Sequence, residues 1–293
     1  MRTSLRVSVA QLTSSNRHDA NIELMKAAAV AAGKDGADLL TLPEVSGLMN
    51  QDGADAKRHV TWPGDDPYIA ACRVQAAEQG IWIHLGSTPV RMSDRRYLNH
   101  SVLLDDHGRT RATYDKIHLF DICLDGQDPT GESRRYEAGD EAVLVDTPWG
   151  LWGLSVCYDL RFPYLYRDYC LNGATVVFVP SAFTVPTGHA HWEVLLRARA
   201  IENGVWVIAP AQVGRHADGR TTYGHSVVID PWGKIDLDLG GNRPAQATVD
   251  IDLEKVAWAR SQIPSLRNGR AYSFRRVERP REAIEDVTGS SSH

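Results

Sequence analysis

The sequence predicts an α/β protein built as a four-layer α-β-β-α sandwich. Strand-like and helix-like segments alternate along the 293 residues, which is typical of a sheet covered by helices. The order strand, helix, strand, helix, strand, strand, strand occurs before Gly150 and again after it, without any repeat of sequence. Because paired strands close each half, two such sheets are expected to pack face to face with helices outside.

The first half opens with a strand at residues 5–12. Apolar residues alternate there with Arg6 and Ser8, which is the period of a strand with two unlike faces. The turn signal at residues 105–108 predicts a hairpin between the last two strands of this half. The other expected elements are a helix at 21–32, a strand at 37–42, a helix at 67–79, a strand at 81–86, and strands at 100–104 and 109–116.

The second half follows the same order. Its expected elements are a strand at 150–157, a helix at 163–171, a strand at 174–179, a helix at 189–203, and strands at 205–211, 225–229 and 245–250. Gly204 is expected to end the longer helix, and residues 230–233 to form the turn between the last two strands. One apolar stripe on the longer helix is expected to face the core. It consists of Val194, Leu195, Ala198 and Ile201.

Composition excludes several classes of partner. Hydrophobic residues at 43% and charged residues at 24% indicate an ordinary soluble globular protein, and the net charge of −5 gives no basic surface for nucleic acid or an anionic membrane. No apolar run approaches a membrane span, and the N-terminus carries no secretory signal. The cysteines lack Cys-x-x-Cys spacing, so we expect free thiols in a reducing cytoplasm. They are Cys72, Cys123, Cys157 and Cys170.

Three apolar segments end at reactive side chains, namely Glu44, Lys116 and Cys157. Taken singly, a buried cysteine, a solvated glutamate and a surface lysine are the ordinary interpretations. Because ligands bind outside the carboxyl ends of strands in open α/β sheets, however, the three groups are expected to converge. Only their combination predicts a hydrolytic site.

The three groups have complementary chemistry. A glutamate beside a thiol accepts its proton as general base, and later protonates a departing amine and activates water. A lysine ammonium stabilises a developing oxyanion, and the backbone N–H of Tyr158 is expected to supply a second donor. A nearby cation is also expected to lower the pKa of the Cys157 thiol.

The sequence shows no strong signal for a metal site or a nucleotide-binding site. His189 and His191 are two residues apart and lack the His-Glu-x-x-His arrangement of a zinc site. Gly-rich phosphate loops are also absent from the sequence. We therefore expect neither a metal nor another cofactor.

Three segments carry a resemblance to a known family. Residues 42–44, 114–121 and 157–163 resemble, in that order, the Glu-Lys-Cys motifs of the nitrilase superfamily of carbon-nitrogen hydrolases. Residues 180–183 and 187–200 are similar to its Nit amidase branch. Three further segments are more similar to enzymes acting on deaminated glutathione than to omega-amidases. These are residues 214–216, 223–226 and 230–233.

The resemblance assigns roles to individual residues. It implies that Glu44 is the general base, Lys116 the oxyanion stabiliser and Cys157 the nucleophile of an acyl-enzyme mechanism. A second glutamate, Glu132, is implied to support the base and the lysine; on the residues alone it is a solvated loop carboxylate. The substrate-binding group implied in the same way is Tyr158, Arg161, Phe183 and Thr187.

Other parts of the pattern bear on substrate and domain organisation. Residues 157–159 read Cys-Tyr-Asp where true nitrilases have Cys-Trp-Glu, which favours an amide substrate over a nitrile. Arg161 holds a substrate carboxylate in this interpretation, or braces the nucleophile turn instead. The polar segment 120–140 is typical of a functional loop and leaves the specificity of the pocket open.

The resemblance covers almost the whole chain, so residues 1–280 are expected to form a single domain, followed by a partly disordered tail at 281–293.

The leading hypothesis is a cytoplasmic, cofactor-free amidase that acts on a small carboxylate-bearing amide through a thioester. Deaminated glutathione is the leading substrate, and the resemblance implies a homodimer or a higher homo-oligomer. The alternatives are an omega-amidase acting on alpha-keto acid amides and a non-catalytic thiol-sensing or interaction protein with the same fold. Intact Glu44, Lys116 and Cys157 argue against the non-catalytic alternative.

Overall fold

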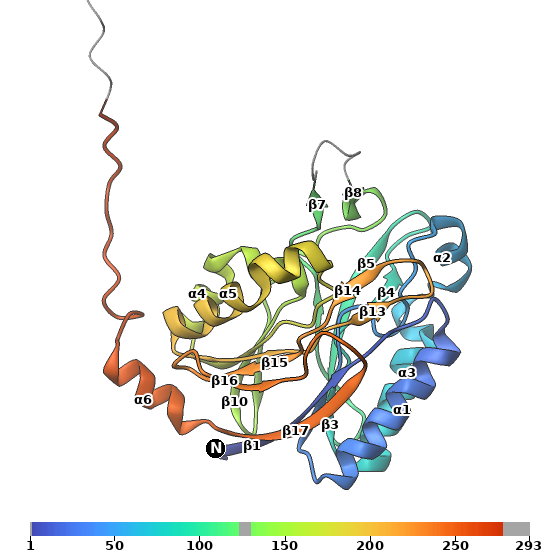
Figure 1. Ribbon diagram of the computed structural model, residues 1–293, viewed down its shortest axis with the longest axis horizontal. Coiled ribbons are helices and arrows are strands. Elements are labelled where there is room, and N and C mark those ends of the chain that lie inside the picture. Colours follow the sequence, from blue (N-terminus) through green and yellow to red (C-terminus); the bar gives the residue numbers. More distant parts are fainter. Residues whose placement is uncertain (1, 123–129, 278–293) are drawn as a thin grey trace, which may run out of the picture.

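Two β-sheets packed face to face form the centre of the computed structural model, which describes residues 2–122 and 130–277 (Figure 1). The first sheet has seven strands. In spatial order they are β17 (Ala245–Asp252), β1 (Ser4–Gln11), β2 (Leu39–Thr41), β3 (Trp82–His84), β5 (Tyr97–Leu104) and β4 (Thr88–Arg91), with β6 (Thr110–Asp115) also paired to β5.

The second sheet has six strands, three of which run parallel in its centre. In spatial order they are β16 (Ile235–Asp238), β15 (Val227–Ile229), β12 (Trp206–Ala209), β11 (Ala174–Phe178), β10 (Gly150–Leu154) and β9 (Leu144–Thr147). Two short ribbons lie outside the sheets. They pair β13 (Val213–Arg215) with β14 (Thr221–Tyr223), and β7 (Asp121–Ile122) with β8 (Thr130–Gly131).

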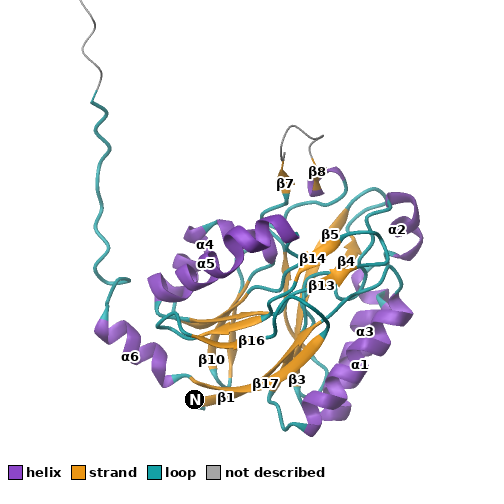
Figure 2. Cartoon of the chain, in the orientation of Figure 1, coloured by secondary structure: helices purple, strands orange, loops and turns teal. Residues whose placement is uncertain are grey.

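Helices cover the outer face of each sheet (Figure 2). The α-helices are α1 (His18–Lys34), α2 (Gly53–His59), α3 (Pro67–Gln79), α4 (Pro163–Leu171), α5 (Val185–Asn203) and α6 (Glu254–Gln262); the short 3₁₀ helices are η1 (Pro63–Asp65), η2 (Glu132–Arg134) and η3 (Cys157–Arg161). Helices α1 and α3 lie on the first sheet, and α4 and α5 on the second. None of these helices is long and apolar enough to cross a membrane.

Hydrophobic packing holds the four layers together. One core cluster lies between the sheets, where Val7 and Leu39 of the first sheet join Trp152 and Phe178 of the second. A second cluster packs α1 and α3 against the outer face of the first sheet. The α-β-β-α sandwich predicted from the element order is therefore confirmed.

Local signals define the helix ends. Asp66 caps α3 by accepting hydrogen bonds from the N–H groups of Tyr68 and Ile69, and Gly80 ends it in the left-handed conformation. Gly204, with φ of 55°, ends α5 in the same way. The predicted bounds of α3 and α4 match the observed ones, whereas α5 begins earlier than the predicted 189, at Val185.

The predicted core stripe of α5 is wrong for Val194 and Ile201, although Leu195 is partly buried against the core. Val194 and Ile201 are 68% and 49% exposed, and the helix buries another face instead. That face consists of Trp192, Leu196, Arg199, Ala200 and Asn203. Arg199 is satisfied there because its guanidinium donates to the carbonyl of Leu160 at 2.8 and 3.2 Å. Because the buried face of α5 contains the charged residue Arg199, the pattern of apolar residues alone did not identify it.

The two halves are also less separate than the element order suggested. The turn at 230–233 joins β15 to β16, a strand that was not predicted, and the two strands pair antiparallel. The expected strand at 245–250 is β17, which crosses to the first sheet and pairs antiparallel with β1 from Ser4↔Asp252 to Gln11↔Ala245. Strand β1 thereby gains a partner on its second side, and its edge is covered.

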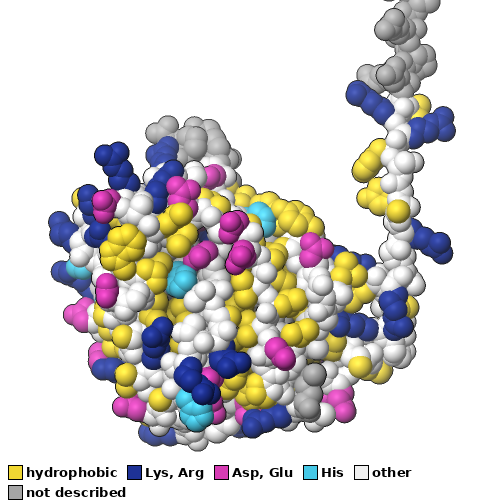
Figure 3. Space-filling view, turned by 180° about the vertical axis from the view of Figure 1, so that it is seen from behind, with side chains coloured by type: hydrophobic (Ala, Val, Ile, Leu, Met, Phe, Trp, Pro, Cys, Tyr) yellow, Lys and Arg dark blue, Asp and Glu magenta, His cyan; other side chains and the backbone are white. Residues whose placement is uncertain are grey.

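Beyond α6 the chain continues as an extended segment that leaves the body of the molecule (Figure 3). Its large side chains are exposed, with Tyr272 at 81% and Phe274 at 92%. The expected tail at 281–293 lies outside the described residues, as does Cys123. The described cysteines Cys72, Cys157 and Cys170 are free thiols.

His84 on β3 makes the stability of the protein sensitive to acid. It is fully buried, bonded to the hydroxyls of Thr41 and Ser101 at 3.1 and 3.0 Å, and burial lowers its pKa to about 3. Since the unfolded side chain titrates near ~6.5, the unfolded state binds more protons between these values. The unfolding free energy should therefore fall by about 1.4 kcal/mol per pH unit on acidification through this window.

Replacing His84 by glutamine should remove this part of the pH dependence. We expect urea unfolding of the H84Q variant to show a shallower loss of unfolding free energy between about pH 6 and pH 4 than the wild type. His107, which is exposed in the β5–β6 turn, provides the matched control as H107Q. Equal pH slopes for H84Q and the wild type would contradict the prediction.

Candidate active site

The three predicted reactive side chains come from three separate strands and line one cavity. Glu44 follows β2, Lys116 follows β6, and Cys157 follows β10 at the first position of η3. The predicted strand at 150–157 ends earlier, at Leu154, because the chain turns into η3 to present the thiol. All three residues are buried, with 4%, 1% and 8% of their surface exposed.

Lys116 lies between two carboxylates. Its Nζ donates to Glu44 Oε1 at 2.9 Å and to Glu132 Oε2 at 2.8 Å. Burial alone would lower the pKa of Lys116, but the charges of Glu132 and Glu44 outweigh it and raise that pKa well above the ordinary value. The side chain is therefore a fixed cation and not a base at neutral pH.

Glu44 is held rigidly on both oxygens. Besides Lys116, its Oε1 accepts from the side-chain amide of Asn99 at 3.0 Å, and its Oε2 accepts from the backbone N–H of Ala182 at 2.9 Å. The next residue, Val45, has φ of 50°, which is strained for a β-branched side chain, and its N–H donates to Ser87 Oγ at 2.9 Å. The backbone strain and the hydrogen bonds together aim the carboxylate into the cavity.

Cys157 also occupies a strained backbone position. Its φ is 50°, and its N–H donates to the carbonyl of Pro180 at 3.0 Å. Burial raises the pKa of the Cys157 thiol well above its ordinary value, and the Glu44 carboxylate raises it further; Lys116 and the N–H of Ala182 act in the opposite direction without prevailing. The nearby cation therefore acts in the expected direction, but the expected net lowering of the Cys157 pKa is wrong, and the resting thiol is protonated.

Asp159 ties the nucleophile turn to the segment that carries Lys116. Its fully buried carboxylate accepts from Tyr114 Oη at 2.6 Å and from the N–H of Val156 at 2.8 Å. It also accepts from the N–H of His118 at 2.9 Å and bonds its Nδ1 at 2.7 Å. Tyr114 and His118 stand two residues either side of Lys116, so this carboxylate fixes the lysine and the thiol relative to each other.

The cavity has a volume of about 310 Å³. Of the predicted substrate-binding residues, Tyr158, Phe183 and Thr187 line it together with the four predicted catalytic ones. Arg161 is not among the lining residues. Its guanidinium lies 5.8 and 5.7 Å from the ring centroids of Tyr158 and Phe183, and Nη2 is 3.3 Å from His191 Nδ1. Of the two roles considered for Arg161, this position fits a brace behind the cavity wall.

Several residues of the site were not predicted from the sequence. They are Asn99, Arg135, Tyr136, Asp159 and Arg220, of which Arg135, Tyr136 and Arg220 line the cavity. The length and polarity of the segment 120–140 marked it as a functional loop, and Arg135 and Tyr136 come from it. Nothing in the sequence pattern singled out Asn99 or Arg220.

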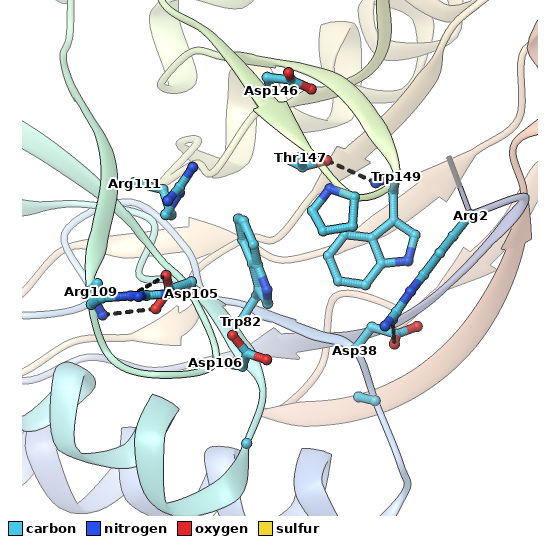
Figure 4. A pocket seen from close by; sticks show the side chains of 13 residues that line it. Arg2, Asp38, Trp82, Asp105, Asp106, Arg109, Arg111, Asp146, Thr147 and Trp149 are labelled. Atoms are coloured by element: carbon cyan, nitrogen blue, oxygen red, sulfur yellow. Dashed lines mark hydrogen bonds and ion pairs between the residues drawn. The ribbon is translucent and has the colours of Figure 1, made fainter.

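A larger cavity of about 660 Å³ lies near the amino ends of β2 and β3, away from these reactive groups (Figure 4). Trp82 and Trp149 form part of its wall. Some of its charges are already paired: Arg2 with Asp38 at 3.2 Å, and Arg109 with Asp105 at 2.9 Å. Among residues 2–122 and 130–277, no cysteine, lysine or histidine lines it, so the smaller cavity is the candidate active site.

Comparison with known proteins identifies the family of this chain. Residues 6–261 match the carbon-nitrogen hydrolase family. Deaminated glutathione amidase of Yersinia enterocolitica is 40% identical over 243 residues, covering 81% of this chain and 84% of that protein. The crystal structure of the C. elegans NitFhit protein superposes with a TM-score of 0.85 at 36% identity, covering 92% of this chain and 66% of that one.

A third relative concerns the cysteine. A mutant of the amidase from Nesterenkonia sp. AN1, solved with acrylamide added at its active site cysteine, superposes with a TM-score of 0.75 at 26% identity. The match covers 89% of this chain and 98% of that one. The chain therefore belongs to the carbon-nitrogen hydrolase family, as an amidase of the Nit branch of the nitrilase superfamily.

Proposed function

We propose that this chain hydrolyses a small carboxylate-bearing amide through a thioester on Cys157, with deaminated glutathione as the leading substrate. The observation that carries the proposal is the meeting of a thiol, a carboxylate and a buried ammonium in one cavity. The curated relatives named deaminated glutathione amidase support the choice of substrate.

In the first step the Cys157 sulfur attacks the amide carbonyl carbon. Glu44 accepts the thiol proton, because the thiol is protonated at rest and needs a base. The C–S bond forms while the carbonyl oxygen becomes an oxyanion. The C–N bond then breaks, and Glu44 returns the proton to the departing nitrogen, leaving a thioester and a free amine.

The second step reverses these roles. Water takes the place of the amine, Glu44 accepts a proton from it, and the hydroxyl oxygen attacks the thioester carbon. The C–S bond then breaks, the carboxylic acid is released, and the proton returns to the sulfur. One carboxylate thus serves both steps as base and acid.

Lys116 stabilises the oxyanion in both steps. Its ammonium is a permanent cation in a buried site, where a charge-assisted hydrogen bond to developing negative charge is strongest. The N–H of Tyr158, next to the nucleophile, is the second donor. Glu132 holds Lys116 from the side opposite Glu44 and limits its movement.

The substrate assignment is tested by direct assay. We expect the purified protein to release cysteinylglycine from deaminated glutathione much faster than it releases ammonia from alpha-ketoglutaramate, measured by chromatography of the products. Preference for alpha-ketoglutaramate would move the assignment to omega-amidase, and inactivity toward both compounds would contradict the substrate class. That the chain works as a homodimer in the cytoplasm stays a prediction.

A further inference from the structure

Two arginines that no motif predicted line the active-site cavity. Arg135 follows η2, and Arg220 lies just before β14 in the turn of the β13–β14 ribbon. Both side chains are half-buried, and they come from segments 85 residues apart in the sequence. Their position on a cavity wall calls for an explanation, because the proposed chemical steps use neither.

Adjacent residues of one loop hold both arginines. Arg135 Nη1 donates to the carbonyl of Asn50 at 3.4 Å. The next residue, Gln51, donates from its N–H to Asp218 Oδ2 at 3.1 Å, and the same oxygen accepts from Arg220 Nε at 2.8 Å. Asn50 and Gln51 also line the cavity, so the two guanidiniums belong to the same part of its wall.

This part of the wall carries more positive than negative charge. The Arg220 guanidinium pairs with Oδ2 of Asp218, whose side chain is only 2% exposed, while Oδ1 accepts from the backbone N–H of Arg220 at 3.1 Å. Arg135 has no carboxylate within 4 Å among residues 2–122 and 130–277. Lys116, by contrast, is already matched by two carboxylates. The surplus cation therefore lies at the arginines and suits an anionic group of a ligand.

Tyr136 connects the arginines with the catalytic groups. Burial raises the pKa of its phenol to about 12, and the charges of Arg135, Glu132, Arg220 and Lys116 all act on it. The hydroxyl is therefore a proton donor within electrostatic range of both arginines and of the Lys116–Glu132 pair. Asn50 and Gln51, which hold the two arginines, belong to the cavity-lining segment that begins at Glu44. The proposed mechanism releases the amine beside Glu44.

We propose that Arg135 and Arg220 bind a carboxylate on the amine half of the substrate, the half that departs in the first step. The inference rests on the proposed function and narrows it to N-substituted amides whose amine ends in a carboxylate, such as a short peptide. Deaminated glutathione has such a group on its glycine, whereas a primary amide releases ammonia and has none. Arg161 does not line the cavity and is not part of this site.

Binding to a Cys157→Ala protein tests the inference without turnover. The two probes are deaminated glutathione and the same compound with its glycine carboxylate converted to an amide, titrated by calorimetry. We expect the free carboxylate to bind at least about tenfold more tightly, since a charge-assisted contact to a guanidinium is lost in the amide. Equal affinities, or no binding of either compound, would overturn the inference.

Arginine variants in the same Cys157→Ala background locate the effect. Arg135→Gln and Arg220→Gln should each weaken binding of the free carboxylate about tenfold while changing affinity for the amide less than about twofold. The matched controls are Arg134→Gln and Arg215→Gln, since Arg134 and Arg215 are exposed and do not line the cavity. Equal losses on both probes would show a structural effect and refute the assignment.

Failure of the proposed function has a separate signature. If the wild-type protein does not hydrolyse deaminated glutathione but the Cys157→Ala protein binds it with the expected carboxylate preference, the substrate assignment fails and the carboxylate site stands. If hydrolysis occurs and both probes bind alike, the proposed function stands and the role of Arg135 and Arg220 is wrong.

Discussion

Replacing Cys157 by alanine should abolish hydrolysis, with a loss in kcat of at least about 10⁴-fold. The variant has no sulfur to form the thioester, and neither Glu44 nor Lys116 is a nucleophile in its place. Because the cysteine side chain is small, circular dichroism and urea unfolding should show an intact fold. Steady-state assays with deaminated glutathione measure the loss.

The chain offers a matched control for this variant. Cys170 on α4 is a free, buried thiol that does not line the cavity, so Cys170→Ala should keep activity while losing a small amount of packing. Intact-mass measurement of the wild type under rapid quench should show an acyl adduct that the Cys157→Ala protein lacks. Activity retained by Cys157→Ala would remove the basis of the proposed mechanism.

Replacing Lys116 by methionine should have the second largest effect, on stability as well as on activity. Methionine fills a similar volume but leaves the carboxylates of Glu44 and Glu132 without their shared cation in a buried site. Removing one partner of a buried ion pair costs about 3–5 kcal/mol of unfolding free energy. Loss of the oxyanion donor should lower kcat about a hundredfold or more as well.

A double variant separates the two effects of this substitution. Lys116→Met with Glu132→Gln removes one of the two opposed carboxylates, so it should regain part of the lost stability in urea unfolding but none of the activity. The comparison also tests whether Glu132 acts by holding the lysine. If the double variant were no more stable than Lys116→Met, repulsion between the carboxylates would not explain the loss.

The ends of α3 were predictable because their signals are local. Asp66 followed by Pro67 begins α3 and Gly80 ends it, and these residues act through their own backbone neighbours. The face that a helix buries is a different matter. On α5 the apolar positions fall on two faces, and the buried face is the one that packs on the second sheet and on η3, where Arg199 donates to the carbonyl of Leu160. No periodicity within α5 contains that information.

The order of strands in a sheet is also beyond local sequence patterns, because it depends on residues far apart in the chain. A strand at 245–250 was expected from composition, and β17 is there. Its pairing with β1 could not be predicted, because no turn joins the two strands and they lie near opposite ends of the chain. The pKa of the Cys157 thiol also depends on the tertiary structure, since burial and Glu44 raise it more strongly than the nearby Lys116 lowers it.

The sequence by itself determined the fold class and the three reactive side chains at strand ends, because alternation of apolar residues and turn signals act over a few residues. Only the tertiary structure decided which charges meet. It placed Lys116 against Glu44, 72 residues away, and Glu132, 16 residues away. It also brought Arg135 and Arg220 to one wall of the cavity. Such contacts depend on how the sheets and loops pack. The periodicity of the sequence does not show which distant charged residues will interact.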